Sequence, residues 1–378
     1  MPGLLPHVDP DGLLEYSVVY TDRALNHMSA RFQGVMRDIS HVLRAAYQPH
    51  SVAVVPGSGT FGMEAVARQF AQDRRCLVLR HGWFSFRWSQ ILQMGRISDQ
   101  VQVLKARPQD PADSQSAWTP APLEEIVATI LRDRPEVVFA PHVETSSGMI
   151  LPDAWLQAIG QATHEAGGLF VLDCIASGAV WVDMAALAVD VLVSAPQKGW
   201  SGSPGCAFVM LSARARERLE ATTSTSFAAD LKKWVQVMET YESGAHTYHA
   251  TMPTDALTLS RAAMLQTQEA GFEQLRDRQW SLGSRVRALM AELGWRSVAA
   301  PAFAAPGVVV SHTRHPGLSS AKGMIALGLQ TASGVPLQCD EPADFQTFRV
   351  GLFGLDKLAD IDRTVGTLAQ AMRALPPA

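Results

Sequence analysis

The sequence lacks the features that mark proteins of nucleic acids and membranes. It contains 32 lysines and arginines against 36 aspartates and glutamates, so its formal net charge is −4, without the basic excess that nucleic-acid-binding proteins use. Its most apolar windows, such as residues 187–195, are too short to cross a bilayer, and no lysine-rich amphipathic stretch suggests a membrane surface. We therefore expect neither a nucleic acid nor a membrane as a partner.

Cysteine is scarce as well. The four cysteines, Cys76, Cys174, Cys206 and Cys339, lie far apart and form no C-x-x-C pair and no zinc-binding spacing. We expect buried or half-buried thiols in a reducing cytoplasm, and no metal site. The first residues also lack the basic region and the long apolar run of a secretory signal peptide, which favours a cytoplasmic location.

Short apolar segments alternate with helical patterns through most of the chain. Residues 29–46 have apolar side chains at spacings of three and four, which is typical of a helix, and further helices are expected at residues 122–131 and 153–164. We predict seven strands, at residues 51–55, 76–79, 101–104, 137–140, 169–172, 191–193 and 206–211. Strands that are apolar throughout and alternate with helices predict an α/β fold with a mostly parallel sheet covered on both faces.

The length of the chain indicates more than one domain. Its 378 residues exceed what one simple core usually covers. After about residue 255 the pattern becomes mostly helical, with a break near Gly271, and strands follow at residues 308–311 and 347–351. We predict an N-terminal segment of residues 1–20, a large domain of residues 21–254, and a smaller C-terminal α+β domain of residues 255–378.

The turn after the first strand has the composition of a phosphate-binding turn. Gly57, Ser58, Gly59 and Thr60 lie between a predicted strand and a predicted helix, where backbone N–H groups at the helix N-terminus suit a phosphate. The turn lacks the Gly-Lys-Ser/Thr ending of a nucleotide P-loop and is shorter than a dinucleotide fingerprint. A plain strand-to-helix turn remains the alternative.

Two charged residues follow later strands. Asp173 ends an apolar run, where a buried carboxylate requires a partner such as a protonated pyridine nitrogen; a helix N-cap or a structural ion pair is the alternative. Lys198 comes just after residues 191–194, where partial desolvation would lower the pKa of the amine and make it nucleophilic. A lysine that extends from the end of the sheet into solvent is the alternative.

Hydroxyl side chains follow a fourth strand, in residues 142–148 (HVETSSG), and they suit either a cofactor ring or a turn. Ligands of open α/β sheets bind at the carboxyl ends of the strands, so these four stretches are able to converge on one pocket. A phosphate cradle, an acidic partner for a ring nitrogen and a lysine that attacks a carbonyl are the parts that a pyridoxal 5′-phosphate (PLP) site needs. Their coincidence predicts a PLP enzyme.

On these residues the sequence resembles the class V, fold-type I aminotransferases, and most closely the alanine–glyoxylate and serine–pyruvate group. The resemblance extends from about His27 to the C-terminus. The matching motifs are residues 57–60 (GSGT), 144–148 (ETSSG), 173–177 (DCIAS), 194–198 (SAPQK), 248–253 (YHATMP) and 348–352 (FRVGL). The resemblance implies the fold-type I PLP-transferase architecture, PLP as the cofactor, and amino acids and 2-oxo acids as substrates.

The resemblance also implies a role for each matching residue. Lys198 would hold PLP covalently as a Schiff base and later move the proton, and Asp173 would pair with the ring nitrogen. Tyr248 and Thr251 would reach the phosphate of the neighbouring subunit, which implies a homodimer with shared active sites. Further cofactor contacts are implied for Ser58, Gly59, Thr60, Phe84, Thr145, Ile175 and Gln197.

Two of the implied roles carry an explicit alternative. Phe84 matches the aromatic residue that stacks on the ring, but Trp83 is adjacent and core packing is the alternative for either side chain. Arg349 matches the arginine that binds the substrate carboxylate, for which a planar guanidinium is suited. The alternative for Arg349 is a surface ion pair with Asp344 or Glu341.

The sequence departs from the family near its start. Relatives usually begin with a Gly-Pro-Gly-Pro loop that closes over the substrate, whereas residues 9–18 here are DPDGLLEYSV. Glu15, Tyr16 and Ser17 are the candidates to line the substrate pocket in its place, so residues 1–20 are expected near that pocket. This difference leaves the identity of the amino donor open, whereas the cofactor residues still match the family.

The expected reaction is ping-pong transamination, in which a small amino acid such as alanine or serine gives its amino group to a 2-oxo acid such as glyoxylate or pyruvate. A PLP-dependent lyase or cysteine desulfurase is the alternative. Desulfurases usually have a histidine before the lysine and a mobile catalytic cysteine, whereas Gln197 precedes Lys198 and Cys339 shows no reactive environment. A non-enzymatic binding module is a third alternative, against which the retention of both Lys198 and Asp173 argues.

Overall fold

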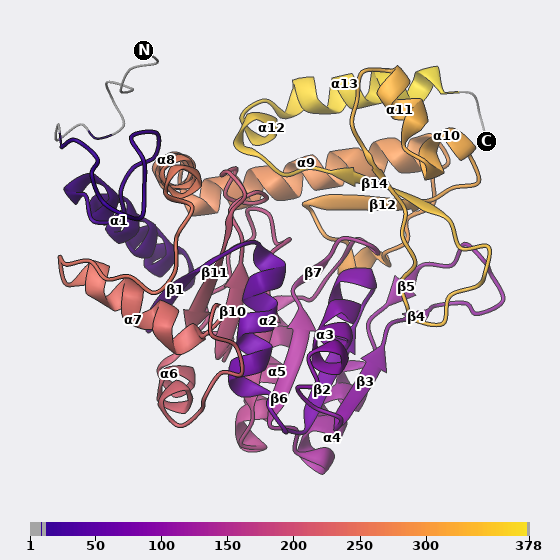
Figure 1. Ribbon diagram of the computed structural model, residues 1–378. Coiled ribbons are helices and arrows are strands. Elements are labelled where there is room, and N and C mark those ends of the chain that lie inside the picture. Colours follow the sequence, from indigo (N-terminus) through magenta and orange to yellow (C-terminus); the bar gives the residue numbers. More distant parts are fainter. Residues whose placement is uncertain (1–8, 10–12, 376–378) are drawn as a thin grey trace.

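A computed structural model describes residue 9 and residues 13–375 (Figure 1). In this part of the chain the centre is a seven-stranded sheet in the order β1-β11-β10-β9-β6-β2-β3. The strands are β1 (Ser51–Pro56), β2 (Cys76–Arg80), β3 (Val101–Lys105), β6 (Val137–Pro141), β9 (Leu169–Asp173), β10 (Val191–Ser194) and β11 (Cys206–Leu211). All seven predicted strands are confirmed, because continuous apolar runs of this length are stable only inside a covered sheet.

The directions of the strands bring several chain segments to one edge. Strand β10 runs parallel to β9, β9 to β6, β6 to β2 and β2 to β3. Only β11 is reversed, since it pairs antiparallel with both β10 and β1. The segments that follow β1, β2, β6, β9 and β10 therefore emerge at the same edge of the sheet.

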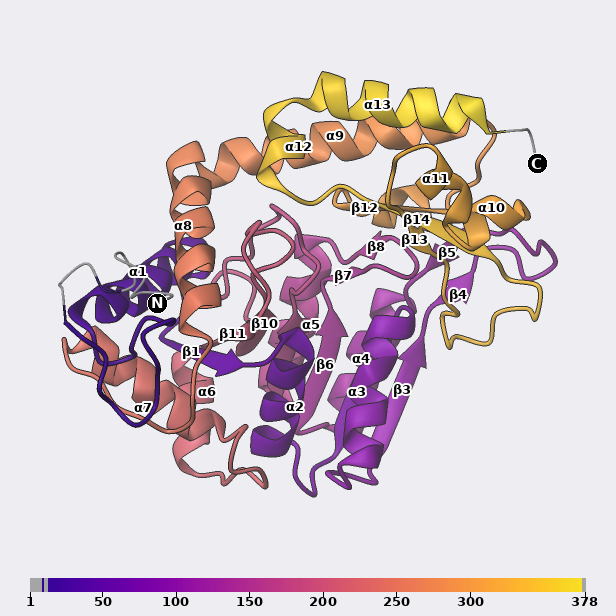
Figure 2. The same ribbon diagram turned by 45° about the horizontal axis from the view of Figure 1, so that its top comes forward.

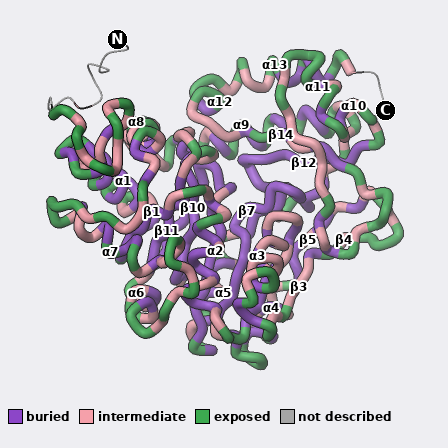
Figure 3. Tube along the Cα trace, in the orientation of Figure 1, coloured by how far each residue is buried: buried purple, intermediate pink, exposed green. Residues whose placement is uncertain are grey.

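Helices cover both faces of this sheet. Figures 1 and 2 show α2 and α3 in front of the strands and α5 behind them. The helices of this region are α1 (Ala30–Tyr47), α2 (Gly59–Phe70), α3 (Trp83–Met94), α4 (Leu123–Asp133), α5 (Asp153–Glu165), α6 (Ala213–Glu220) and α7 (Leu231–Glu242). In Figure 3 the central strands are buried and the exposed residues lie on the outer helices and loops, as expected for a sheet that is apolar on both sides.

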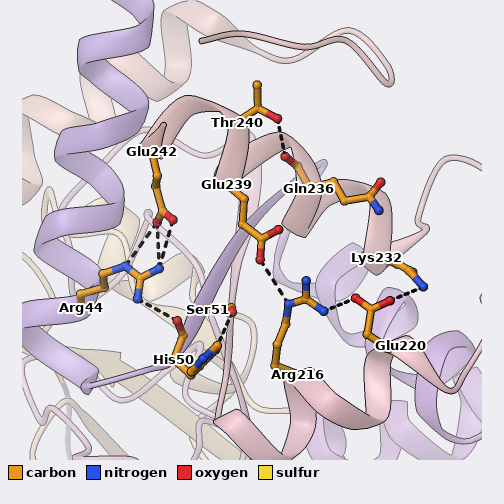
Figure 4. A network of polar contacts seen from close by, with 10 residues as sticks. All are labelled: Arg44, His50, Ser51, Arg216, Glu220, Lys232, Gln236, Glu239, Thr240 and Glu242. Carbon is orange, nitrogen blue, oxygen red and sulfur yellow. Dashed lines mark hydrogen bonds and ion pairs between the residues drawn. The ribbon is translucent and has the colours of Figure 1, made fainter. Parts of the chain in front are cut away.

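A chain of ion pairs joins the outer helices α1, α6 and α7 (Figure 4). Arg44 of α1 contacts Glu242 at the end of α7, with 2.9 Å between Nη2 and Oε1. Arg216 of α6 contacts Glu239 of α7 with 3.2 Å between Nε and Oε1, and it also pairs with Glu220 within α6. These side chains are partly exposed, so the pairs fix the helix ends while most of the stabilisation comes from the apolar faces.

The C-terminal part forms a second, smaller unit. Helix α8 (Thr254–Ala270) leads through Gly271 into α9 (Phe272–Glu292), as the predicted break requires. A three-stranded antiparallel sheet in the order β12-β14-β13 packs beneath α9. The remaining elements here are η1 (Pro301–Phe303), β12 (Val308–His312), α10 (Pro316–Ser319), α11 (Lys322–Ala326), β13 (Ala332–Ser333), β14 (Thr347–Gly351), α12 (Leu355–Ala359) and α13 (Ile361–Ala374).

The hydrophobic cores follow this division. Leu257 and Met264 of α8 belong to the core of the large sheet, whereas Leu275 and Leu282 of α9 belong to a second core. The predicted domain boundary near residue 255 thus falls at the start of α8, and the change of core falls between α8 and α9. Of the predicted N-terminal segment, residues 1–8 and 10–12 lie outside the described residues.

Two short antiparallel pairs connect the two units. They are β4 (Arg107–Pro108) with β5 (Trp118–Thr119), and β7 (Val143–Glu144) with β8 (Met149–Ile150). Arg287 of α9 also spans the junction, because its Nη2 lies 3.5 Å from the carbonyl oxygen of Gly148 in the large unit and donates to those of Ala305 at 2.6 Å and Val308 at 3.0 Å in the small unit. None of the helices within residues 13–375 is long and apolar enough to cross a membrane.

Candidate cofactor and substrate site

The carboxyl ends of the parallel strands enclose a cavity of about 140 Å³. It is lined by nine of the residues predicted from sequence, which are Ser58, Gly59, Thr60, Phe84, Thr145, Asp173, Ile175, Gln197 and Lys198. Of the four further lining residues, Val143 and Ala176 lie within motifs that the sequence analysis named, whereas Met63 and Arg87 escaped it. Residues that lie up to 140 positions apart in the sequence therefore meet because parallel strands end at the same edge.

One end of the cavity is formed by the N-terminus of α2. Ser58 is the N-cap residue, and its side chain accepts no capping hydrogen bond. The first-turn N–H groups of Gly59 and Thr60 have no acceptor within the helix, so they remain available to an anion. A Cβ atom at Gly59 would lie 2.5 Å from Cδ1 of Ile175, so the absence of a side chain lets the turn pack against the cavity wall.

The other end of the cavity holds a buried carboxylate. Asp173 is 7% exposed, and its Oδ1 accepts a hydrogen bond of 2.9 Å from the backbone N–H of Ile175. Burial raises the pKa of Asp173 to about 6, although that N–H and the charge of Lys198 act in the opposite direction. A protonated ring nitrogen placed beside this carboxylate would remove much of its desolvation cost.

Lys198 also lines this cavity. Its Nζ is 5.8 Å from the centroid of the Phe84 ring and 5.7 Å from that of Phe353. Desolvation lowers the pKa of the amine most strongly, the charges of Asp173 and Glu144 raise it, and the charge of Arg349 lowers it further. The predicted location of Lys198 is thus a partly desolvated one, and the alternative of a solvent-exposed lysine is wrong.

Three basic side chains lie close to the aromatic ring of Phe84. Besides Lys198, the guanidinium carbon of Arg87 lies 4.8 Å from the ring centroid and that of Arg349 lies 5.5 Å from it. Arg87 also donates from Nη1 to Oγ1 of Thr60 at 3.0 Å, which connects α3 to the phosphate-binding turn. Trp83, the alternative stacking residue, does not line the cavity; its ring lies 6.0 Å from that of Phe86.

Arg349 of β14 extends from the small unit toward the cavity. Its Nε donates to the carbonyl oxygen of Ser333 at 2.8 Å, and burial lowers the pKa of the guanidinium. The alternative of a surface ion pair is wrong, because Asp344 pairs with Arg314 at 2.9 Å and Glu341 accepts hydrogen bonds from the backbone of residues 337–339.

Two groups of candidate residues do not reach the cavity of their own chain. Tyr248 and Thr251 hydrogen-bond each other at 3.0 Å and do not line it. Glu15 accepts from the backbone N–H of Ser17 at 2.7 Å, and Tyr16 is 90% exposed. None of Glu15, Tyr16 and Ser17 lines this cavity.

The cysteines behave as expected, since all four are buried and free. Cys339 is 4% exposed, and burial raises the pKa of its thiol to about 12. A thiol in this state is not the accessible, thiolate-forming group that sulfur chemistry requires. The described residues contain no group of three or more histidine, cysteine, aspartate or glutamate side chains that could hold a metal ion.

The residues of the cavity fit PLP. Helix-terminal N–H groups and hydroxyls suit the phosphate, Asp173 suits the ring nitrogen, the face of Phe84 suits the ring, and the amine of Lys198 suits the aldehyde carbon. The signal for Arg87 was present in the sequence: it stands three residues after Phe84, and residues at this spacing share one face of a helix.

Comparison with known proteins agrees with this site. The family described as aminotransferase class-V matches residues 17–317. A 2-aminoethylphosphonate–pyruvate transaminase of Pseudomonas aeruginosa is 28% identical over 86% of this chain and 83% of its own length. The small subunit of a soluble hydrogenase of Synechococcus is 28% identical over 75% of this chain and 71% of its own length.

The fold also matches solved structures. An alanine–glyoxylate aminotransferase from Nostoc superposes with a TM-score of 0.77 at 23% identity, covering 92% of this chain and 89% of the other. At this identity the match shows the fold, which is fold-type I, and the predicted architecture is confirmed.

Proposed function

The chain belongs to the aminotransferase class-V family and is a PLP-dependent transaminase, and on that premise we propose that Lys198, Asp173 and Arg349 carry out its reaction. The observation that carries the proposal is the convergence of three chemistries on one cavity: a helix N-terminus at Gly59, a buried carboxylate at Asp173, and a desolvated amine at Lys198. None of these three features alone would be specific for a PLP site.

Each of the three residues acts on a different part of the bound reactants. PLP supplies an electron sink that stabilises negative charge at the substrate Cα atom. The amine of Lys198 would take the proton from that Cα atom and, in the second half of the reaction, would give a proton to the Cα atom of the newly formed amino acid. The ionised carboxylate of Asp173 keeps the proton on the ring nitrogen, and the free Nη groups of Arg349 bind the carboxylate of each substrate in turn.

The substrates follow from the charges and from the relatives. Arg349 and Arg87 flank the Phe84 ring, so the cavity favours an anionic amino donor and an anionic acceptor. The names of the similar proteins include pyruvate and glyoxylate as acceptors. We therefore assign a small amino acid such as alanine or serine as donor, and pyruvate or glyoxylate as acceptor.

The proposal extends to the assembly and the location. Tyr248 and Thr251 lie outside the cavity of their own chain, and Tyr248 is 51% exposed, which supports their role at the phosphate of a second subunit. The protein would then be a homodimer with shared sites. The free, buried cysteines support a cytoplasmic location, where thiols stay reduced.

A visible absorption spectrum tests the function directly. The purified protein supplied with PLP is expected to be yellow, and one donor from a panel of alanine, serine and 2-aminoethylphosphonate should bleach the band, which pyruvate or glyoxylate then restores. A protein that stays colourless would refute the assignments of Lys198 and Asp173. A yellow protein that converts cysteine to alanine and sulfide without an oxo acid would instead be a lyase.

A further inference from the structure

A second carboxylate lies behind the cavity, and the reaction does not use it. Glu144 of β7 is completely buried at 0% exposure. It takes part in none of the ion pairs between described residues, the nearest cations being those of the cavity. A buried carboxylate without an ion-pair partner is costly, so it must be satisfied by hydrogen-bond donors.

Those donors all come from two short segments. Oε2 of Glu144 accepts from the backbone N–H and the hydroxyl of Ser85, both at 2.8 Å. Oε1 accepts from the N–H of Phe84 at 3.3 Å, and from the N–H and hydroxyl of Ser146 at 3.0 and 2.8 Å. The hydroxyl of Ser146 in turn accepts from the N–H of Trp83 at 2.9 Å. The three first-turn N–H groups of α3 are therefore all satisfied by Glu144 and Ser146.

This arrangement replaces an ordinary helix cap. The N-cap residue of α3 is Gly82, which has no side chain to accept from the first turn. A Cβ atom at Gly82 would clash with Oγ of Ser146 and would lie 2.8 Å from Cγ of Glu144. The glycine thus leaves room for a carboxylate from another segment, which also places a negative charge at the positive end of the helix dipole.

The helix held in this way presents two residues to the cavity. Phe84 lies in its first turn and provides the ring around which Lys198, Arg87 and Arg349 gather. Arg87 lies one turn further on and reaches the Thr60 hydroxyl. A rotation or shift of the first turn of α3 would move both side chains relative to the cofactor.

We propose that Glu144 is a positioning residue, whose buried carboxylate caps α3 from outside the helix and thereby sets Phe84 against the cofactor ring and Arg87 against the phosphate-binding turn. The inference rests on the proposed cofactor site and names a residue behind it. Glu144 touches neither cofactor nor substrate, and it acts through the backbone of α3.

The donors require a carboxylate in particular. The backbone N–H of Ser85 donates to Oε2 of Glu144 at 2.8 Å and that of Ser146 donates to Oε1 at 3.0 Å, so both positions need an acceptor. The Ser85 hydroxyl shares its proton between Oε2 of Glu144 and the carbonyl oxygen of Gly82 at 3.0 Å. A glutamine at position 144 would place an NH₂ group against the donors of either Ser85 or Ser146. Glu144→Gln keeps the shape of the side chain and removes only the match between two acceptor oxygens at position 144 and the donors that face them.

The test compares Glu144→Gln with a control that is equally buried. Asp190, at 1% exposed, also lacks solvent and accepts from the N–H of Phe170 at 2.9 Å and from Ser212 Oγ at 3.0 Å. It precedes β10, whereas Lys198 follows that strand, so Asp190 lies at the opposite edge of the sheet. Asp190→Asn should lower the melting temperature without altering the cofactor.

The readouts are the dissociation constant of PLP and the circular dichroism induced in its visible band, which reports the orientation of the ring. In folded Glu144→Gln we expect PLP to bind about tenfold more weakly, as for the loss of a charge-assisted hydrogen bond, and the induced signal to fall. If Glu144→Gln leaves the dissociation constant and the induced signal unchanged and lowers only the melting temperature, as Asp190→Asn does, the inference is overturned. A wild-type protein without a visible band would refute the proposed cofactor site instead.

Two further variants keep the test decisive if Glu144→Gln fails to fold. Ser146→Ala removes the hydroxyl that links Trp83 to Glu144 and should give a smaller change of the same kind. Combining Ser146→Ala with Phe84→Leu should give less than the sum of the two single effects on PLP binding, because both act through the Phe84 ring. Fully additive effects would contradict the inference.

Discussion

At the scale of single residues, the chemistry depends on the location of Lys198 rather than on its identity alone. The amine lines the cavity, and desolvation is the main cause of its lowered pKa, so a larger fraction is neutral and nucleophilic than for a surface lysine. Lys232, which pairs with Glu220 on the surface, has no such environment.

We therefore expect borohydride reduction of the PLP-loaded protein to attach the cofactor to the peptide that contains Lys198, as detected by mass spectrometry. Lys198→Ala should show no attachment at that peptide and should lose turnover by about 10²–10⁴-fold or more, the usual contribution of a proton-transferring group. Lys232→Ala is the control and should behave like the wild type. Retained turnover in Lys198→Ala would refute the mechanism.

Asp173 makes the stability of the cofactor-free protein depend on pH. Its pKa is raised from 3.8 to about 6 by burial. The folded protein therefore binds more protons than the unfolded chain between these pH values, and its free energy of unfolding falls as the pH rises through this window. The carboxylate is thus a cost to the empty fold, which the proposed pairing with a protonated ring nitrogen of PLP would offset.

Asp173→Asn should remove the destabilisation that the buried, ionised carboxylate causes in the cofactor-free protein. Without cofactor, the melting temperature of the variant relative to the wild type should increase from about pH 4 to about pH 6 and then stay constant. With PLP the order should reverse, because the amide is a poor partner for a protonated ring nitrogen. A melting-temperature difference that does not vary with pH would contradict the assignment.

Arg349 should affect substrate affinity more than cofactor binding. Arg349→Lys keeps the charge but loses the two parallel N–H groups, and we expect the KM for both substrates to rise about 10–100-fold, the range for loss of a charge-assisted hydrogen bond. Arg314→Lys is a matched control in the same unit, since Arg314 pairs with Asp344 on the surface. Equal effects of the two variants would argue against a role for Arg349 in binding carboxylates.

At the scale of elements, the sequence predicted those strands that are long and uniformly apolar. Most of the central strands are of this kind, whereas β3 (VQVLK) and the strand at 347–351 (TFRVG) carry polar residues among the apolar ones. The pairs β4–β5 and β7–β8 were not predicted, because two-residue strands carry no periodic signal and their pairing is decided by tertiary contacts.

Among the site residues, too, those with a local sequence signal were predicted and those that depend on tertiary packing were missed. Residues directly after strands, such as Asp173 and Lys198, were predicted because parallel strands converge at one edge. Phe353 was missed because it belongs to the smaller unit, and its approach to Lys198 depends on how the two cores pack. The capping role of Glu144 was missed because the helix that it caps begins 61 residues earlier in the chain.

The close packing at the N-terminus of helix α2 leads to a testable prediction. Gly59→Ala would place a methyl group 2.5 Å from Cδ1 of Ile175, so the helix end or Ile175 must shift and PLP should bind more weakly. Gly34→Ala, in the interior of α1, meets no atom within 4 Å and should stabilise the protein by up to about 1 kcal/mol. Thermal melting and PLP titration distinguish the two; stronger PLP binding by Gly59→Ala would contradict the proposed phosphate end.

At the scale of the whole molecule, several aromatic side chains are exposed to solvent. Phe61 follows the phosphate-binding turn and is 57% exposed, Phe227 is 78% exposed, and Tyr248 is 51% exposed. Exposed aromatic groups beside a binding site favour an interface between copies of the chain. The proposed dimer would cover them and bring Tyr248 and Thr251 to the opposite cavity.

Shared sites make a prediction that a merely structural dimer does not. In a mixed dimer of Lys198→Ala and Tyr248→Phe chains, one site combines both substitutions, whereas the other combines the intact Lys198 of one chain with the intact Tyr248 of the other. Subunits exchanged under mild denaturant should therefore recover PLP affinity and turnover above the sum of the two separate variants. If Tyr248 served the cavity of its own chain, no site in the mixture would be intact and mixing would recover nothing. Native mass spectrometry of the same samples separates the mixed dimer from the two parent dimers by mass and would establish that mixed dimers had formed, so a failure to complement would count against shared sites.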